Sequence, residues 1–259
     1  MGVIYNFQEA KNSVFCVVHD CQKNEKKVGD QVLLVCDKCN REFQDRRANN
    51  YDEQAIKFRA LRLRNLKLSN DLKSKDFDNY QIYESKQKEI IEDLKVFVDV
   101  VMSGEKKSNL LLIGPTGTGK SHLATGVLKH LNTKWMLGKT IDFISSFKLA
   151  QKVMNSWGQA DIASDDLFEE YSNMDFLVID DFGFNDEGPK MKIIQKILFM
   201  RHENDKPTFI TSNLLQDECL ELMGDRVKSR FLGNLYKSLT VNFADYRLKD
   251  FDHDMQLKI

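Results

Sequence analysis

The stretch Asn109-Leu-Leu-Leu-Ile-Gly114-Pro-Thr-Gly-Thr-Gly-Lys120-Ser121 decides the fold of this chain. Its second half matches the pattern G-x4-G-K-[ST] at every fixed position. The apolar run 109–113 is typical of a buried strand, and the residues from Ser121 onward are typical of a helix start. A glycine-rich turn between a strand and a helix is the context in which this pattern binds phosphate. The sequence therefore predicts a phosphate-binding loop, and a chance glycine-rich turn is the weaker interpretation.

The residue types in this loop fit the chemistry of a nucleoside triphosphate. Glycines allow backbone N–H groups to point at the β- and γ-phosphates, and the helix N-terminus adds a favourable dipole. Lys120 offers a positive charge to the phosphate oxygens, and the hydroxyl of Ser121 is a ligand for Mg²⁺. The predicted ATP-binding residues of the loop are Gly114, Pro115, Thr116, Gly117, Thr118, Gly119, Lys120 and Ser121.

Two further strands end in polar residues that suit the same site. The run 176–179 is followed by Asp180 and Asp181, of which the first would hold Mg²⁺ and the second would orient or deprotonate the attacking water. The run 208–211 is followed by Ser212 and Asn213, and the amide of Asn213 would lie beside the γ-phosphate. Strands often end in such turn-forming residues, so the third signal gains its weight from the first two. The predicted catalytic residues at this stage are Lys120, Asp180, Asp181 and Asn213.

From residue 81 onward, short apolar runs alternate with longer helix-like segments. This alternation predicts an α/β fold with a parallel sheet and flanking crossover helices. The helix 90–102 is expected to be amphipathic, and the candidate strands are Leu110–Ile113, Ile141–Ile144, Phe176–Ile179, Thr208–Thr211 and Ser238–Asn242.

Composition limits the other possibilities. The chain has 259 residues, of which 42% are hydrophobic and 30% are charged, with a formal net charge of −1. It has no apolar run long enough for a bilayer and no signal peptide at its start, which predicts a cytoplasmic protein with no membrane partner. The near-zero net charge means that any contact with nucleic acid must come from local patches.

Four of the five cysteines lie between residues 16 and 39. Cys16 with His19, and Cys36 with Cys39, form two pairs at i, i+3 spacing, which is typical of tetrahedral Zn²⁺ sites. Cys21 is a competing ligand that could replace His19. Reduced thiols without metal are the alternative in a reducing compartment. We expect a small zinc ribbon over residues 1–47, and we expect Cys219 to be a small buried residue.

A polar, basic stretch follows the cysteines. Between residues 41 and 75 there are ten Lys or Arg and five Asp or Glu. The simplest interpretation is a solvated helical linker over residues 48–80, leaving 81–259 for the ATPase domain; a stretch that contacts DNA or a partner is the alternative.

The segment Met223-Gly-Asp-Arg-Val-Lys-Ser-Arg-Phe231 narrows the choice of protein family. Together with the three elements above, with Tyr246-Arg247 and with Lys75-Asp-Phe-Asp-Asn-Tyr80, it resembles the DnaC/DnaI-type helicase loaders over about residues 68–250. These are AAA+ ATPases, and the IstB transposition helpers are more distantly similar. The resemblance implies an AAA+ P-loop core, and the little chain after Arg247 predicts that it lacks a full helical lid.

The resemblance also implies roles for single residues. Arg230 would be an arginine finger that reaches the nucleotide of a neighbouring subunit, with Arg226 as the nearby alternative. Arg247 would contact the nucleotide of its own subunit. AAA+ proteins mostly have Asp-Glu where this chain has Asp180-Asp181, which puts the rate of hydrolysis in question. On the helix after residue 144, Ser145, Ser146, Lys148 and Lys152 would contact single-stranded DNA. Phe147 would either stack on a base or belong to the core.

The function that the resemblance implies is the ATP-dependent loading of a DnaB-type replicative helicase hexamer on single-stranded DNA during DNA replication. The cofactors would be ATP, Mg²⁺ and Zn²⁺, and ATP would control both self-assembly and release. The zinc ribbon, also found at the start of some phage loaders, would contact the helicase. Two alternatives stay open: an IstB-like transposition helper on duplex DNA, and a binding module whose ATPase site is vestigial.

Overall fold

The computed structural model of the chain describes residues 15–16, 21–22, 24–28, 31–105, 108–135, 138–157 and 164–246. By its internal contacts the chain divides into two units, residues 1–58 and 59–259, which are described here separately. None of the helices in the described part of the chain is long and apolar enough to cross a membrane.

The first unit contains two short antiparallel hairpins. Strands β1 (Phe15–Cys16) and β2 (Cys21–Gln22) pair so that Cys16 lies opposite Cys21. Strands β3 (Asn24–Val28) and β4 (Gln31–Val35) pair in the second hairpin. Helix α1 (Asp37–Asn65) follows directly and continues into the second unit. A regular helix therefore crosses residue 47, and the division into residues 1–47, 48–80 and 81–259 stays a prediction.

The second unit is built on a sheet of five parallel strands. In spatial order these are β6 (Ile141–Ser145), β7 (Phe176–Asp180), β8 (Thr208–Ser212), β5 (Asn109–Ile113) and β9 (Leu235–Thr240). All five residues of β5, β7 and β8 are buried, which explains their unbroken apolar runs. Because every strand is parallel to its neighbours, all the carboxyl ends lie at one edge of the sheet.

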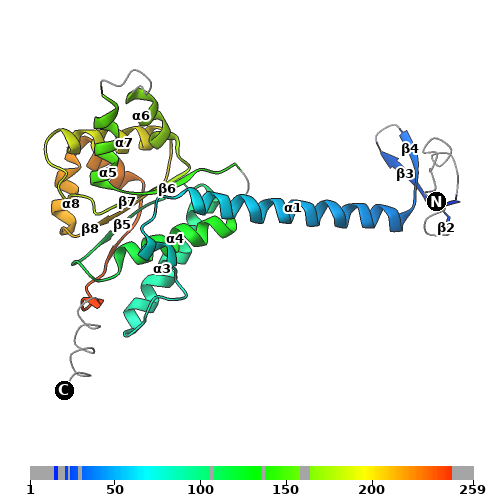
Figure 1. The fold of residues 1–259 in the computed structure, drawn as a ribbon, viewed down its shortest axis with the longest axis horizontal. Coiled ribbons are helices and arrows are strands. Elements are labelled where there is room, and N and C mark those ends of the chain that lie inside the picture. Colours follow the sequence, from blue (N-terminus) through cyan, green and yellow to red (C-terminus); the bar gives the residue numbers. More distant parts are fainter. Residues whose placement is uncertain are drawn as a thin grey trace. The chain divides into compact units, whose positions relative to one another are not determined.

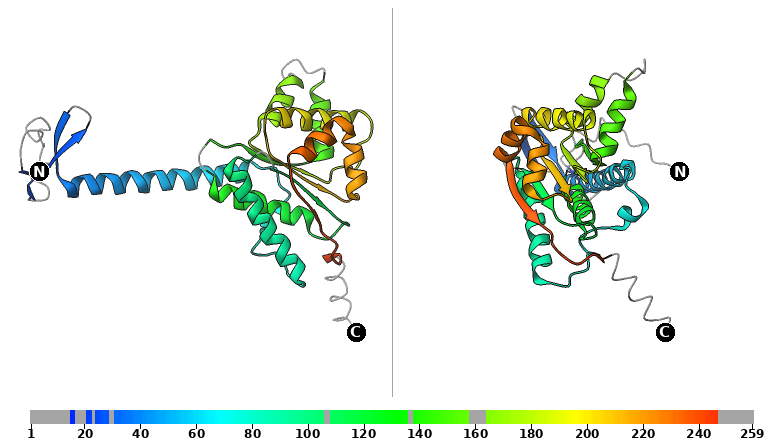
Figure 2. Two further views of the ribbon diagram at one scale, coloured as in Figure 1. Left: turned by 180° about the vertical axis from the view of Figure 1, so that it is seen from behind. Right: turned by 90° about the vertical axis from the view of Figure 1, so that its left-hand side faces the viewer.

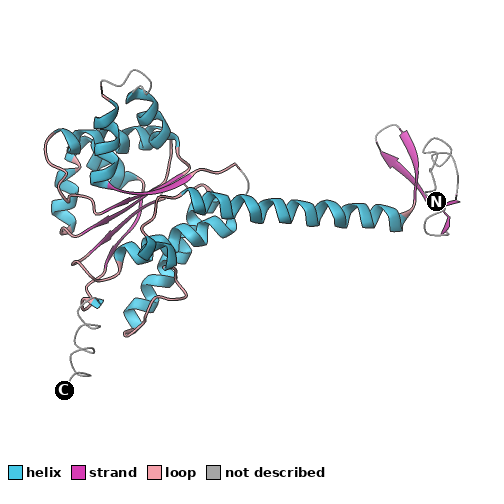
Figure 3. Cartoon of the chain, viewed as in Figure 1, coloured by secondary structure: helices cyan, strands magenta, loops and turns pink. Residues whose placement is uncertain are grey.

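Helices cover both faces of this sheet. Figure 3 shows its strands, in magenta, between two groups of helices. The described helices of the unit after α1 are α2 (Asn70–Ser74), α3 (Ser85–Ser103), α4 (Lys120–Lys134), α5 (Ser146–Ser156), α6 (Ser164–Asn173), α7 (Pro189–Glu203), α8 (Gln216–Leu222) and α9 (Gly224–Gly233). In Figure 1, α3 and α4 lie on one face, and α5, α6 and α7 lie on the other. The two further views of Figure 2 show the same layers.

Each face of the sheet has its own hydrophobic core, because successive side chains of a strand point to opposite faces. Leu110 and Leu112 of β5 pack with α3 and α4. Leu111 and Ile113 of the same strand pack with the helices on the other face. The α/β architecture expected from the alternation of strands and helices is thus confirmed.

Two elements differ from the sequence prediction by three or more residues at one end. Strand β9 begins at Leu235 and not at Ser238, because its pairing with β5 already starts where Leu235 lies opposite Asn109. Helix α3 begins at Ser85, five residues before the predicted start at Ile90. A capping box between Glu84 and Gln87 sets this start. The predicted start relied on the apolar periodicity, which begins at Ile90 and does not indicate the cap.

Candidate nucleotide-binding site

A cavity of about 600 Å³ lies against the phosphate loop, residues 114–121, at the carboxyl-terminal edge of the sheet. In parallel α/β sheets this edge is where ligands bind. The residues that line the cavity come from the phosphate loop, from the turns after β7 and β8, from the segment 71–83 and from the C-terminal segment. They are Asp71, Leu72, Lys75, Asn79, Tyr80, Gln81, Tyr83, Thr116, Gly117, Gly119, Lys120, Ser121, His122, Asp181, Phe184, Asn213 and Tyr246.

Lys120 is the central cation of this site. Its ammonium group donates to the carbonyl oxygens of Gly114 and Pro115, both at 2.8 Å, and to Oδ1 of Asn213 at 2.6 Å. Only 5% of its surface is exposed, although it lines the cavity. A buried cation beside a cavity is a strong point charge for an incoming anion. The structure therefore brings Lys120 and Asn213 together, as the sequence predicted.

Two glycines of the loop are required by close contacts and by their backbone angles. Gly114 has φ +151°, and a Cβ on it would lie 1.9 Å from the carbonyl oxygen of Val241. Gly119 has φ +89°, and a Cβ there would lie 2.8 Å from the ring of Tyr80. Both positions exclude a side chain, which is the physical reason for the glycines of the motif.

The Mg²⁺ ligands predicted from the sequence also lie together. Ser121 Oγ donates to Oδ1 of Asp180 at 3.0 Å, and Thr211 Oγ1 donates to the same oxygen at 2.5 Å. Burial, with a smaller contribution from the neighbouring Asp181, raises the pKa of Asp180 to about 6. The hydroxyl of Ser121 and the carboxylate of Asp180 are oxygen ligands of the kind that suits Mg²⁺. Asp180 and Ser121 are thus the residues that would hold the ion.

Asp181 lies one residue further, on the wall of the cavity. Its backbone has φ +53°, in the left-handed region, and its N–H donates to Thr211 Oγ1 at 3.1 Å. This conformation turns the chain sharply after β7, so that Asp181 does not continue the strand that ends at Asp180. One carboxylate of the pair is buried, while the other borders the space where a nucleotide would lie.

Arg226 and Arg230 lie on α9, away from the described residues that line the cavity. Both guanidinium groups stack on the ring of Phe199 of α7, at 4.4 and 4.8 Å from its centroid. Arg230 also pairs with Glu203, with 3.4 Å between Nε and Oε1. Neither arginine reaches the cavity of its own chain. Arg247 lies outside the described residues, so its role stays a prediction.

The helix predicted to contact DNA is α5, and several of its predicted DNA contacts are buried or bonded to other residues of the protein. Ser146 is fully buried, and Ser145 caps the helix by accepting from Lys148 N–H at 3.4 Å. Lys152 donates to the hydroxyl of Tyr171 at 3.0 Å and pairs with Glu170 at 3.5 Å.

Phe147 and Lys148, in the first turn of α5, are the two remaining residues predicted to contact DNA. Phe147 is half-buried under the ammonium group of Lys190, at 4.3 Å, and belongs to neither core cluster that the described residues form. Lys148 alone among the predicted DNA contacts is an exposed cation. The expectation that Ser146 offers its hydroxyl to DNA is therefore wrong, because that side chain is inside the protein.

Several cavity residues were not predicted as site residues. Tyr80, Tyr83 and Tyr246 are clustered, with ring centroids 6.0 Å apart for Tyr80–Tyr246 and 5.6 Å for Tyr83–Tyr246. His122 Nε2 faces two acceptors, the carbonyl of Asp76 at 2.7 Å and Oδ1 of Asn79 at 2.9 Å, so it carries a proton and donates. Burial lowers the pKa of His122. Tyr80 and Tyr246 belong to the segments Lys75–Tyr80 and Tyr246-Arg247, which carry the resemblance, whereas Tyr83 and His122 lie outside both segments.

The zinc prediction falls mainly on residues that the structure does not describe. His19 lies outside the described residues, and so do the side chains of Cys16, Cys21 and Cys39. Cys36 is buried between β4 and α1, and Cys219 is buried in a hydrophobic core of the second unit. Among the described side chains, no group of three His, Cys, Asp or Glu residues could hold a metal ion. The zinc ribbon stays a prediction from the sequence.

Comparisons with known proteins agree with this geometry. The model of a family described as IstB-like ATP binding protein matches residues 33–249. The replicative helicase loader DnaC of Escherichia coli strain K12 is 30% identical over 175 residues, which are 66% of this chain and 68% of that protein. The replicative helicase loader DnaC of Buchnera aphidicola subsp. Acyrthosiphon pisum is 30% identical over 174 residues, with the same shares.

Solved structures show the same fold. The crystal structure of the DnaC helicase loader superposes with a TM-score of 0.57 at 23% identity, covering 67% of this chain and 99% of that one. A putative primosome component from Streptococcus pyogenes serotype M3 gives a TM-score of 0.55 at 22% identity, covering 70% of this chain and 92% of that one.

Proposed function

Because this chain belongs to the family of IstB-like ATP-binding proteins, with a DnaC-like AAA+ domain, we propose that it is an ATP-hydrolysing loader of a replicative helicase. The observation that carries the proposal is the assembly of Lys120, Ser121 and Asn213 on the lining of one cavity, with Asp180 bonded to Ser121 and Asn213 bonded to Lys120. These four side chains come from three different strand ends, and a vestigial site would have no reason to keep them all in contact. The relatives named replicative helicase loaders supply the cellular role.

The roles of the site residues follow from where they lie. The phosphate loop and Lys120 would bind the β- and γ-phosphates of ATP, and Ser121 and Asp180 would hold Mg²⁺, which supplies charge neutralisation during phosphoryl transfer. Asp181 would orient the attacking water, and Asn213, held next to the Lys120 ammonium group, would sense the γ-phosphate. ATP and Mg²⁺ are therefore the proposed cofactors.

The proposed partners are a DnaB-type helicase hexamer, single-stranded DNA and further copies of this chain. On α5, Lys148 is the exposed cation that supports DNA binding, whereas Lys152 would first have to leave Tyr171 and Glu170. Such exposed ion pairs are worth less than about 1 kcal/mol, so DNA phosphates can compete for this lysine. Affinity gained in this way should fall with rising salt.

The second candidate function is an IstB-like helper of transposition that acts on duplex DNA. The specific observation in its favour is the description of the family model, which matches residues 33–249. The two functions share the ATPase site and differ in partner and in the form of DNA that is bound.

Affinity capture of partners by the full-length chain decides between them. With ATP and Mg²⁺ we expect recovery of a hexameric replicative helicase, and we expect the amount recovered to change when ADP replaces ATP. Lys120→Ala, which removes the phosphate-binding cation, serves as the control for nucleotide dependence. Recovery of a transposase, together with a preference for duplex over single-stranded DNA, would instead assign the chain to transposition.

Replacement of Arg230 by alanine tests the proposed assembly. Since Arg230 does not reach the cavity of its own chain, affinity for ATP should stay within about twofold, while ATP hydrolysis in the assembled state should fall at least tenfold. Hydrolysis is measured by phosphate release as a function of protein concentration. Lys228→Ala, on the same helix, is the matched control and should behave like the unchanged chain. If only Arg226→Ala gives the defect, the trans-acting residue is one helical turn earlier.

A further inference from the structure

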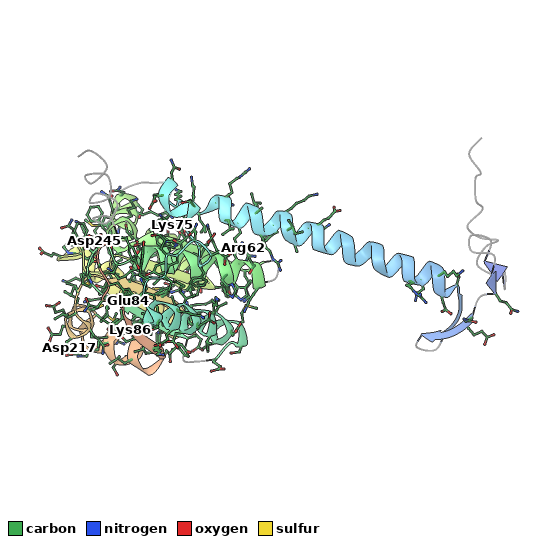
Figure 4. The ribbon with its side chains drawn as sticks, turned by 90° about the horizontal axis from the view of Figure 1, so that it is seen from below. Arg62, Lys75, Glu84, Lys86, Asp217 and Asp245 are labelled. Carbon is green, nitrogen blue, oxygen red and sulfur yellow. The ribbon has the colours of Figure 1, made fainter. Side chains whose placement is uncertain are left out.

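Gln87 is a buried amide at the start of α3 that sequence reasoning did not identify. Only 1% of its surface is exposed. Its Oε1 accepts from the N–H of Glu84 at 2.9 Å and from the N–H of Tyr83 at 2.6 Å, and its Nε2 donates to the hydroxyl of Tyr246. The start of α3 can be found in Figure 4 by the labels of Glu84 and Lys86, and the C-terminal segment by that of Asp245.

These contacts exceed the needs of a helix cap. A glutamine at this helical position needs a single bond, to the N–H of the capping residue. Gln87 makes that bond with Glu84, and it also holds the peptide before the cap and a tyrosine 159 positions away in the sequence. Its amide therefore joins three segments of the chain: α3, the segment that precedes it and the C-terminal segment.

Tyr246 extends this connection to the phosphate loop. Its N–H donates to the carbonyl oxygen of Gly117 at 3.1 Å. The hydroxyl of Tyr80 donates to the next carbonyl, that of Thr118, at 3.2 Å. Two tyrosines thus hold two successive peptide groups of the loop, and Gln87 holds one of these tyrosines.

The orientation of these peptide groups matters for phosphate binding. A phosphate loop binds anions through backbone N–H groups that point inward, which requires stable partners for the carbonyls that point elsewhere. A loop whose peptides are already oriented loses less conformational freedom when the ligand binds. The contacts of Tyr80 and Tyr246 fix the orientation of two such peptide groups.

We propose that Gln87 is a positioning residue for nucleotide binding, which acts by holding Tyr246 and thereby the Gly117 peptide of the phosphate loop. Gln87 is absent from the described residues that line the cavity, whereas Tyr83 and Tyr246 are present, so its effect is transmitted through these neighbours. The inference rests on nucleotide binding as part of the proposed function, and it is independent of the helicase and of DNA.

The test is a titration of the full-length chain with a fluorescent ATP analogue, with Mg²⁺ present. Gln87→Met keeps the length of the side chain and removes its hydrogen bonds, and we expect about three- to tenfold weaker binding. Gln195→Met is the matched control. Gln195 is likewise a glutamine whose Nε2 donates a hydrogen bond, in its case to the carbonyl of Leu222 at 2.8 Å, and it is absent from the cavity lining. Its variant should bind the analogue as the unchanged chain does.

A second variant removes the same contact from the other side. Tyr246→Phe deletes the hydroxyl group, which accepts from Gln87 and donates to the carbonyl of Gln81 at 3.4 Å, so it tests the connection even if Gln87→Met fails to fold. We expect a similar loss of affinity, and the double variant should bind within about twofold of the weaker single variant, because both changes remove one shared bond.

Thermal unfolding without nucleotide separates positioning from capping. If Gln87→Met lowers the unfolding temperature but binds the analogue normally at a temperature where it is folded, Gln87 is only a helix cap and the inference fails. Fully additive losses in the double variant would also overturn it. If the unchanged chain itself does not bind the analogue, the proposed ATPase function fails as well, so the two failures are distinguishable.

Discussion

Replacement of Lys120 by alanine is expected to lower the affinity for ATP by roughly a hundredfold. The ammonium group is buried at the wall of the cavity, where its bonds to the carbonyls of Gly114 and Pro115 and to Oδ1 of Asn213 hold it in place to meet the phosphates. Losing hydrogen bonds to a charged partner costs about 1.5–3 kcal/mol each, and about 2.7 kcal/mol corresponds to a hundredfold change in the dissociation constant. Titration with a fluorescent ATP analogue measures this change.

The fold should survive this substitution, because Lys120 lines the cavity and water can take the place of its ammonium group. Lys129→Ala is the matched control on the same helix, since Lys129 binds the carbonyl of Lys73 and lies 3.9 Å from Asp76. It should leave the affinity unchanged. A folded Lys120→Ala protein that binds ATP like the unchanged chain would refute the phosphate-loop assignment.

Replacement of Asp181 by asparagine should lower the rate of ATP hydrolysis by about 10²–10⁴-fold, as expected when a group that positions or deprotonates the attacking water is lost. The change keeps the backbone intact, because asparagine adopts the left-handed conformation of Asp181 readily and the N–H bond to Thr211 is retained. Affinity for ATP should therefore change by less than about threefold. Phosphate release in a single turnover, with protein in excess over ATP, measures the chemical step.

Asp217→Asn is the control for this experiment, since Asp217 lies in the first turn of α8 and is absent from the cavity lining. Its hydrolysis rate should match that of the unchanged chain. A normal rate in Asp181→Asn would mean that the second carboxylate after β7 has no part in the reaction. In that event the Asp-Asp pair, where related ATPases mostly have Asp-Glu, would have to work through Asp180 alone.

The strands and the phosphate loop were predictable because their causes are local. A parallel strand buried on both faces needs a continuous apolar run, and 109–113, 176–179 and 208–211 are such runs. The glycines of the loop are required by backbone angles within eight residues of sequence. Once parallel strands are predicted, their carboxyl ends must meet, so Asp180 and Asn213 could be placed beside Lys120 without coordinates.

The rest of the site depends on contacts between segments far apart in the sequence. Gln87 and Tyr246 are 159 positions apart, and each is an ordinary polar or aromatic residue in its own neighbourhood. Lys152 looked like a free cation on α5 because its partners, Glu170 and Tyr171, belong to another helix. Neither hydrophobic periodicity nor a local motif in the sequence indicates contacts between residues so far apart.

Arg201 shows the same limit within the core. An arginine in the last turn of a helix is usually expected at the surface, yet only 1% of the surface of Arg201 is exposed. Its guanidinium donates to the carbonyls of Tyr171, Met174 and Pro207 and to Thr208 Oγ1, at 2.6–3.0 Å. Those acceptors are brought together only when α6, α7 and β8 pack.

The sequence by itself therefore determined the sheet, the phosphate loop and the acids that follow its strands, because strand burial and loop conformation are encoded in neighbouring residues. Only the tertiary structure decided which tyrosines order the loop, which lysine of α5 stays exposed and on which side of the molecule Arg226 and Arg230 lie. Those features depend on hydrogen bonds and ring contacts across the fold. A hydrogen bond forms only at a defined distance and angle between donor and acceptor, and the packing of distant segments sets both.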